Sequence, residues 1–323
     1  MDYRVLPRTK LRVSRLSMGT MTFGSQVSEA DSIRMVDRCM DAGINFFDTA
    51  NIYNGGESER IVGIALKGRR DKVILASKVR GKMGDGPDEA GLSSRAMRKG
   101  IEASLKRLQT DYLDLYYLHM PDYEVGIEET LETMAELVRE GKVRFPAISN
   151  YAAWQVTQIL WICEKKGYPA PTISQPMYNL LARAIEEEYL PFCKEHQVAV
   201  LPYNPLAGGL LTGKHKSAAP PTSGTRFDGN KMYLDRYWHS DYFHAVEEAG
   251  AIAKERGLTL VELAFRWLLS QAIVDSVILG ASRMEQLEAN LKACEGKPLD
   301  EATLGRCTDV WMRLRGVTPK YNR

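Results

Sequence analysis

The chain has 323 residues, 44% of them hydrophobic, so it can bury a sizeable core and is neither a disordered nor a fibrous protein. Its 43 Lys and Arg residues almost balance its 41 Asp and Glu residues, and the net charge of +2 argues against a protein that mainly binds nucleic acid or anionic lipid. The N-terminal segment lacks the apolar core of a signal peptide, and no stretch approaches the roughly 20 apolar residues of a membrane span, so we expect a cytoplasmic protein.

Short runs rich in β-forming residues alternate with longer runs of helical periodicity along the whole chain. The predicted strands cover residues 15–18, 45–48, 73–78, 113–119, 143–149, 172–175, 198–203 and 276–279. The predicted helices that follow them cover residues 32–42, 58–67, 93–108, 127–140, 152–166, 185–196, 260–270 and 283–293. Gly43, Gly68, Gly141 and Gly167 stand where four of these helices are expected to end.

Eight strands, each followed by a helix and with no linker-like stretch between them, predict one α/β domain over residues 1–323, a (β/α)8 TIM barrel. Residues 3–13 are predicted to form an N-terminal β-hairpin that plugs the barrel floor. Extra C-terminal helices are predicted near residues 242–256 and 299–314. Residues 206–240 follow the seventh strand and are rich in Gly, Pro and charged residues, so we expect a long irregular loop on a binding face.

Polar residues close the second, third and fourth predicted strands, at the end of the barrel where this fold carries its chemistry. Asp48 ends the second strand with Tyr53 five residues later, while Lys78 and His119 end the next two. Each alone is commonly a strand end that meets water, but three consecutive units would bring all four to one rim. A Lys ammonium lowers the pKa of a neighbouring phenol toward the working range, so we expect Tyr53 to donate a proton. Asp48 would hold Lys78 in place, and His119 would hydrogen-bond a substrate carbonyl oxygen.

Other motifs exclude some cofactors and leave one phosphate site open. The five cysteines are far apart and the five histidines form no HExxH motif, so no metal is expected. No GxGxxG follows a strand, and residues 208–214, GGLLTGK, lead into His215 rather than the Ser or Thr of a P-loop, so neither a Rossmann domain nor nucleoside triphosphate hydrolysis is expected. At the eighth strand, a Gly280 turn leads through Ser282 and Arg283 into a helix, which is either a phosphate site or an ordinary helix cap with a solvated Arg.

Several long, separately spaced motifs carry a family resemblance: RVSRLSMGTMTFG, FDTANIYNGGESE, ILASKV, RLQTDYLDLYYLHMPD, ISN, NPLAGGLLTGK and ILGASRMEQLEAN. Together they resemble the aldo-keto reductases, NADPH-dependent enzymes built on a (β/α)8 barrel. The C-terminal two-thirds, with SNYAAW, SQPMYN, RYW and the end of the chain, is most similar to the aflatoxin-aldehyde and succinic-semialdehyde reductases. The N-terminal third resembles the family more generally.

This resemblance implies that Tyr53 protonates the carbonyl oxygen with support from Asp48, Lys78 and His119. It also implies an NADPH site formed by residues from the ends of most strands and from the long loop. The implied set is Gly19, Thr20, Met21, Ser149, Asn150, Gln175, Tyr203, Asn204, Leu206, Ala207, Gly209, Thr212, Lys214, Gly280, Ser282, Arg283, Gln286 and Asn290. Ser282 and Arg283 would bind the 2′-phosphate, and Tyr203 would stack on the nicotinamide.

The expected substrate is a small carbonyl compound held by the long loop and the tail. Met21, Met120, Trp238 and Tyr321 are the expected apolar walls, and at least one of Arg226, Arg236 and Arg323 is expected to bind a carboxylate. The principal hypothesis is therefore NADPH-dependent reduction of aldehydes or reactive ketones to alcohols, with detoxification as a natural use. Neither a nucleic-acid nor a membrane partner is expected, and a homodimer stays open.

Two other functions stay open at this stage. The first is an NADPH-binding auxiliary subunit that senses redox state with little turnover, as in barrels of this kind attached to ion channels; the complete set of Asp48, Tyr53, Lys78 and His119 argues against it. The second is a barrel enzyme that binds phosphorylated sugars through the site after the eighth strand. It would need no nicotinamide cofactor.

Overall fold

A computed structural model describes residues 1–217 and 219–318 and confirms the predicted (β/α)8 barrel. Its parallel strands are β3 Leu16–Gly19, β4 Phe46–Asp48, β5 Ile74–Val79, β6 Leu113–Leu118, β7 Val143–Ser149, β8 Ile173–Gln175, β9 Ala199–Val200 and β10 Val277–Leu279, hydrogen-bonded in the order β10-β3-β4-β5-β6-β7-β8-β9. Backbone hydrogen bonds from Asp275 N to Val200 O (2.9 Å) and from Ile278 N to Pro202 O (3.1 Å) join the two ends of this order. The sheet is therefore closed.

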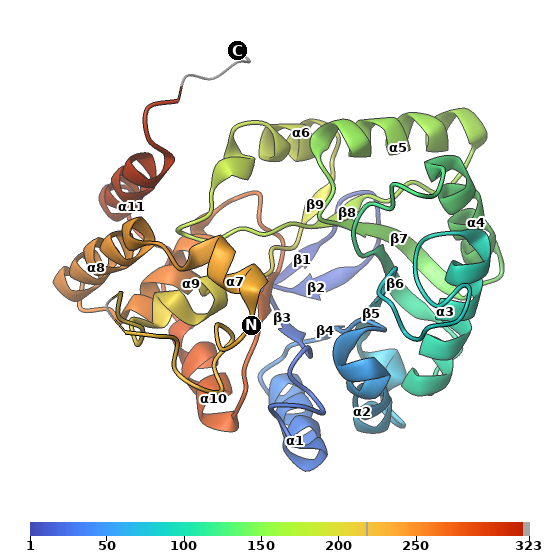
Figure 1. Cartoon of the computed structure of the whole chain (residues 1–323), viewed down its shortest axis with the longest axis horizontal. Helices are drawn as coiled ribbons and strands as arrows, with labels where there is room; N and C mark the ends of the chain where they lie inside the picture. Colours follow the sequence, from blue (N-terminus) through green and yellow to red (C-terminus); the bar gives the residue numbers. More distant parts are fainter. Residues whose placement is uncertain (218, 319–323) are drawn as a thin grey trace.

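The helices form a ring outside the strands, from α1 and α2 through α3, α4, α5 and α6 to α8, α9 and α10 (Figure 1). Their bounds are α1 Glu29–Asp41, α2 Glu57–Ala65, α3 Ser94–Leu108, α4 Ile127–Arg139, α5 Ala153–Lys166, α6 Tyr189–Glu195, α7 Lys231–Tyr237, α8 Ser240–Glu255, α9 Leu260–Ser270, α10 Met284–Ala293 and α11 Glu301–Arg315. Most of the strands between them are buried on both faces, which explains why they appear in the sequence as short apolar runs.

Capping residues set several helix ends. Ser93 accepts a hydrogen bond from Ala96 N at the start of α3, and Thr259 forms a reciprocal capping box with Glu262 at the start of α9. Gly167 ends α5 with φ 70°, a conformation that favours glycine, as predicted for that position. Ser28 accepts a hydrogen bond from Asp31 N, so α1 begins at residue 29 and the predicted start at residue 32 was three residues late.

The N-terminal hairpin, β1 Tyr3–Val5 and β2 Arg12–Ser14, closes the barrel at the amino ends of the strands, as predicted. Asn45, just before β4, donates to Arg12 O (2.8 Å) and accepts from Ser14 N (2.8 Å). Leu6 and Val13 are fully buried in a cluster with inward-facing residues of β4 to β9. This apolar layer excludes water from the lower barrel.

Two segments differ from the predicted elements. Residues 206–240 are not an uninterrupted loop, because they contain the 3-10 helix η4 Ala207–Thr212 and the helix α7, which Asn230 caps by accepting from Tyr233 N. The predicted helix 185–196 is divided into the 3-10 helix η3 Ala184–Glu186 and α6. Part of the long segment is held by aromatic packing, since His215 and Trp238 both contact the ring of Phe227.

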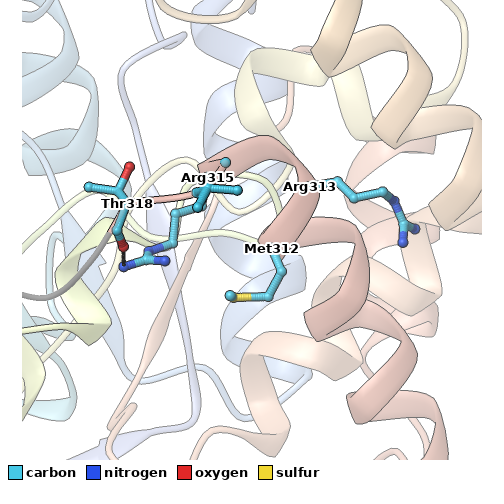
Figure 2. A pocket seen from close by; sticks show the side chains of 6 residues that line it. Met312, Arg313, Arg315 and Thr318 are labelled. Atoms are coloured by element: carbon cyan, nitrogen blue, oxygen red, sulfur yellow. Dashed lines mark hydrogen bonds between the residues drawn. The ribbon is translucent and has the colours of Figure 1, made fainter.

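The last helix, α11, ends beside a hollow that lies apart from the strand ends (Figure 2). Its lining residues are Met312, Arg313, Arg315, Gly316, Val317 and Thr318. Arg315 donates to Glu187 and, within the lining of the hollow, to Thr318 O (Figure 2). Across the part of the chain that the structure describes, the helices lack the combined length and apolar character needed to cross a bilayer.

The contact between α2 and α3 depends on a glycine. A Cβ at Gly63 would lie 2.6 Å from Arg107 O and 2.8 Å from Leu108 Cα, so Gly63→Ala should force the two helices apart. We expect a loss of about 1–3 kcal/mol in the free energy of unfolding, measured by urea denaturation. Gly250→Ala in α8 is the matched control, because nothing lies within 4 Å of its Cβ position, and it should gain about 0.5–1 kcal/mol. Equal stability of the two variants would contradict this packing.

Candidate active site

A buried cluster at the carboxyl ends of β4 and β5 joins three of the predicted residues. The ammonium of Lys78 donates to Asp48 Oδ1 (2.5 Å), to the backbone oxygen of Thr49 (2.8 Å) and to the Tyr53 hydroxyl (3.2 Å). Lys78 is 0% and Asp48 2% exposed, so this ion pair lies entirely within the barrel. Tyr53 begins the 3-10 helix η1 Tyr53–Gly56 just after β4, which brings its hydroxyl back over Lys78.

Burial and charge together maintain Lys78 and Tyr53 in their protonated forms. Burial disfavours the ammonium of Lys78, but the Asp48 carboxylate and Tyr53 together leave its pKa raised. Burial also raises the pKa of Tyr53, and the nearby Lys78 ammonium only partly opposes this. The expectation that Lys78 lowers the Tyr53 pKa below its ordinary value was therefore wrong, because desolvation dominates. Tyr53 is therefore a protonated phenol, and it can donate its proton when an acceptor binds beside it.

His119 completes the cluster from the end of β6. Its backbone N–H donates to Val79 O (3.0 Å), and its ring lies edge-on to the Tyr53 ring with centroids 6.0 Å apart. Burial, together with the positive charges of Lys78 and Arg80, lowers its pKa to about 3. His119 is thus a neutral imidazole at physiological pH and can serve as a hydrogen-bonding group without carrying charge.

The polar residues at the ends of β7, β8 and the following segment form a connected network beside this cluster. Asn150, with φ 63°, donates to His119 O (2.9 Å) and to Ser149 Oγ (3.0 Å), and accepts from the Tyr203 hydroxyl (2.8 Å). Ser149 Oγ donates to Gln175 O (2.8 Å), and the Gln175 amide donates to Asp48 Oδ2 (2.8 Å). One rim therefore carries the four candidate catalytic residues and these four predicted cofactor residues.

The loop after β3 lies against the same rim. A Cβ at Gly19 would lie 2.7 Å from the Ile278 side chain, so this position has room only for glycine. Thr20 is buried and hydrogen-bonded to Ser58 (2.8 Å), while the Asn54 amide donates to Met21 O (3.0 Å). These contacts fix the loop directly beside Tyr53.

The segment after Tyr203 turns sharply several times. Asn204, Ala207, Gly208, Gly209 and Gly213 all have positive φ, and Asn204 Oδ1 accepts from Gly208 N (2.6 Å). Leu206 O accepts the N–H groups of Gly209 and Leu211, and Thr212 Oγ1 donates to Gly209 O. Such a turning backbone can present N–H groups to an anion.

Two cations converge at the end of this segment. Burial lowers the pKa of Lys214, and the positive charge of Arg283 at the start of α10 lowers it further. Neither side chain forms an ion pair with an acid in residues 1–217 or 219–318. Cations brought together without an acid between them suit a phosphate group, so the residues present fit the phosphate end of a dinucleotide.

The turn before α10 uses four of the residues expected to contact a cofactor. Gln286 Oε1 accepts from Ser282 N and lies 2.9 Å from Ser282 Oγ, and the Asn290 amide donates to Gly280 O (3.1 Å). The amides of Gln286 and Asn290, which were expected to contact the cofactor, therefore also shape this turn.

The residues that were expected to bind substrate do not all lie at the rim. Met21 and Met120 are about 40% exposed at the rim, and Arg236 lies close enough to Tyr203 to lower its pKa, although burial raises that pKa overall. Arg226 donates to the Tyr233 hydroxyl (3.4 Å). Trp238 packs instead with His215, Phe227 and Phe243. Tyr321 and Arg323 lie outside the described residues.

Two residues at this rim were not anticipated from the sequence. Tyr233 of α7 is buried close enough to Tyr53 and Tyr203 to raise the pKa of both, with burial as the larger cause. Arg80 follows Lys78 by two residues and lies close to His119. The position of Arg80 just after a predicted strand was the sequence feature from which it could have been identified. Within the described ranges, no group of three or more His, Cys, Asp or Glu side chains could bind a metal ion.

Comparisons with known proteins agree with this geometry. The profile of the aldo/keto reductase family matches residues 15–312. An uncharacterized oxidoreductase YrpG of Bacillus subtilis is 38% identical over 99% of both chains, and aflatoxin B1 aldehyde reductase member 2 of Homo sapiens is 36% identical over 95% of this chain and 89% of that protein. A probable voltage-gated potassium channel subunit beta of Arabidopsis thaliana is 36% identical over 93% of each chain.

The neutral state of His119 predicts acid sensitivity of the fold. Its folded pKa of about 3 lies below the unfolded value of 6.5, so below pH 6.5 the unfolded chain binds a proton that the folded chain does not, and stability falls as pH falls toward 3. Between pH 7 and pH 5, wild type should lose about 2 kcal/mol more unfolding free energy than His119→Gln in urea titrations. His244→Gln, on the exposed side of α8, should behave as wild type. Parallel pH curves for wild type and His119→Gln would contradict a neutral imidazole at this position.

Proposed function

The chain belongs to the aldo/keto reductase family, and from this premise we propose that it reduces aldehydes or reactive ketones to alcohols with NADPH, using Tyr53 as the proton donor. The observation that carries the proposal is the position of the Lys78 ammonium between Asp48 and the Tyr53 hydroxyl, with the neutral His119 ring against Tyr53. It is an arrangement of a proton donor and a hydrogen-bond donor without a covalent nucleophile.

Each residue has a separate task in this proposal. When bound, the dinucleotide would supply the hydride for the carbonyl carbon. Tyr53 gives its proton to the carbonyl oxygen, and His119 orients that oxygen by a hydrogen bond. As the phenol loses its proton, negative charge develops on Tyr53, and the Lys78 ammonium 3.2 Å away stabilises it. Asp48 maintains Lys78 in its charged form.

The proposed cofactor site has two ends. Asn150, Gln175 and Tyr203 would hold the nicotinamide, and the turning backbone of residues 204–213 would hold the pyrophosphate; the hydrogen bond between Tyr203 and Asn150 supports the first assignment and the positive φ angles the second. Lys214 and Arg283 favour NADPH over NADH. Their positive charges lie close together, and the 2′-phosphate that only NADPH carries would neutralise them. We further propose that the 323 residues act as one cytoplasmic domain, and that detoxification of carbonyl compounds is its use.

A second candidate function is a redox-sensing auxiliary subunit. It is supported by the 36% identity to the plant protein named as a probable potassium channel subunit beta. The two candidates differ in turnover: the reductase consumes NADPH with an aldehyde at an ordinary enzymatic rate, whereas the auxiliary subunit binds NADPH with little consumption. The complete cluster around Lys78 favours the reductase.

Tyr53→Phe tests the proton donor. The variant should lower kcat for aldehyde reduction by about 100-fold or more, because it removes the proton source, while leaving NADPH affinity within a few-fold of wild type. The measurements are NADPH oxidation at 340 nm and fluorescence titration of NADPH. Tyr189→Phe is the matched control, since it removes another buried hydroxyl, bonded to Ser174, and should retain turnover. Undiminished turnover in Tyr53→Phe would remove Tyr53 from this role.

Arg283→Ala tests the phosphate end of the site. The loss of its guanidinium should weaken NADPH binding by about 10- to 100-fold and NADH binding by much less, because only NADPH carries the 2′-phosphate. Fluorescence titration with both dinucleotides measures the two losses. Arg34→Ala, whose exposed side chain pairs with Asp31, is the control and should change neither affinity. Equal losses for NADPH and NADH would place Arg283 away from the 2′-phosphate.

A further inference from the structure

Arg80 lies at the rim between the segments that carry His119 and Tyr53. It follows β5 directly, and because His119 N donates to Val79 O (3.0 Å), Arg80 stands beside His119 in the parallel pairing of β5 and β6. The next residue is Gly81, where a Cβ would lie 2.6 Å from the Ile52 Cβ, just before Tyr53. The backbone of Arg80 therefore passes between the two groups that would meet the carbonyl oxygen.

The backbone of Arg80 is strained. Its φ of 121° is in the region that side chains other than glycine rarely adopt. Such a conformation is energetically unfavourable, and it persists only where the surrounding structure or a function holds it. Glycine would occupy this position without that cost.

Among residues 1–217 and 219–318, the Arg80 side chain has neither a hydrogen bond nor an ion pair. Its Nε is buried. Two acids at this end of the barrel have other partners: Asp48 pairs with Lys78, while Asp122 accepts the backbone N–H groups of Leu92 (2.8 Å) and Glu124 (3.2 Å). Buried donors are nearly always satisfied, so a strained backbone that positions an unpaired guanidinium points to a ligand.

We propose that Arg80 binds the carboxylate of an acidic aldehyde substrate and so determines a preference for substrates of this class. The proposal rests on the reductase function proposed above. Guanidinium and carboxylate pair through two parallel hydrogen bonds, and the single positive charge of Arg80 matches the charge of one carboxylate. Met21, Ile52 and Met120, each about 40% exposed, supply apolar surface at the same rim. The substrate that fits has a reactive aldehyde, an apolar body and a single carboxylate.

The test compares an acid with its uncharged ester. Wild type and Arg80→Met are assayed with NADPH and either 4-carboxybenzaldehyde or methyl 4-formylbenzoate. Arg80→Met should lower kcat/KM for the acid by about 10- to 100-fold, mainly through KM, and change kcat/KM for the ester by less than about threefold. Equal losses on both substrates, or no loss on either, would overturn the proposal.

Two further variants separate recognition from other effects. Lys82→Met removes a cation from the same loop, but Lys82 is exposed and paired with Asp85 (2.6 Å), so the ratio of acid to ester should match wild type. Arg80→Gly suits the observed φ, so it should fold with a melting temperature no lower than that of wild type and still lose the preference for the acid. A preference that survives in Arg80→Gly would contradict carboxylate binding by Arg80.

A binding measurement keeps this proposal distinct from the proposed function. Calorimetry with 4-(hydroxymethyl)benzoate, the alcohol product of the acid, is carried out on the full chain in the presence of NADP+. Wild type should bind it about tenfold or more tightly than Arg80→Met. Absence of turnover with both aldehydes but loss of this binding in Arg80→Met would contradict the reductase function and support the role of Arg80. Turnover of both aldehydes by wild type, with equal binding of 4-(hydroxymethyl)benzoate to wild type and Arg80→Met, would support the reductase function and contradict the role of Arg80.

Discussion

The site depends on one buried ion pair, between Lys78 and Asp48. Removing two charges from water costs several kcal/mol each, and their attraction repays this only when the remaining hydrogen bonds are also satisfied. Here Thr49 O and the Tyr53 hydroxyl accept from the ammonium, and the Gln175 amide donates to the second carboxylate oxygen. The pair consequently ties β4, β5 and β8 together and orients the side chains that face the rim.

The barrel provides the environment that this pair requires. Below it lies the apolar layer formed by the hairpin and the inward-facing residues of the strands, with the Tyr117 ring centroid 5.8 Å from the Lys78 ammonium. The low dielectric of this layer strengthens the interaction of Lys78 with Asp48 and with any charge that develops on Tyr53. It also explains why the His119 imidazole stays neutral, because a third buried charge would have no acidic partner.

The sequence was most informative where burial and position follow directly from the pattern. Apolar strands such as Ile74–Val79 and Leu113–Leu118 were predicted within a residue at each end, and the rim residues followed from their place after those strands. Helix α7 was not predicted, because its seven residues are too short to show a helical period. The direction of the Tyr53 pKa shift was wrong because the sequence shows the neighbouring Lys78 but not the depth of burial. The positive φ of Arg80 gave no signal, since the sequence has an ordinary arginine where the backbone would favour glycine.

The hairpin restricts the routes by which ligands reach the site. Because Leu6 and Val13 fill the lower end, the barrel is closed on that side, and the site is reached from the carboxyl ends of the strands. Every molecule that reaches Lys78 must enter and leave past the same loops, so whichever ligand sits deeper has to arrive first and depart last. Any proton lost from Tyr53 must also be replaced from the same end. A change in the loops that narrows this entrance would therefore slow exchange of all ligands together, without altering the groups at the bottom.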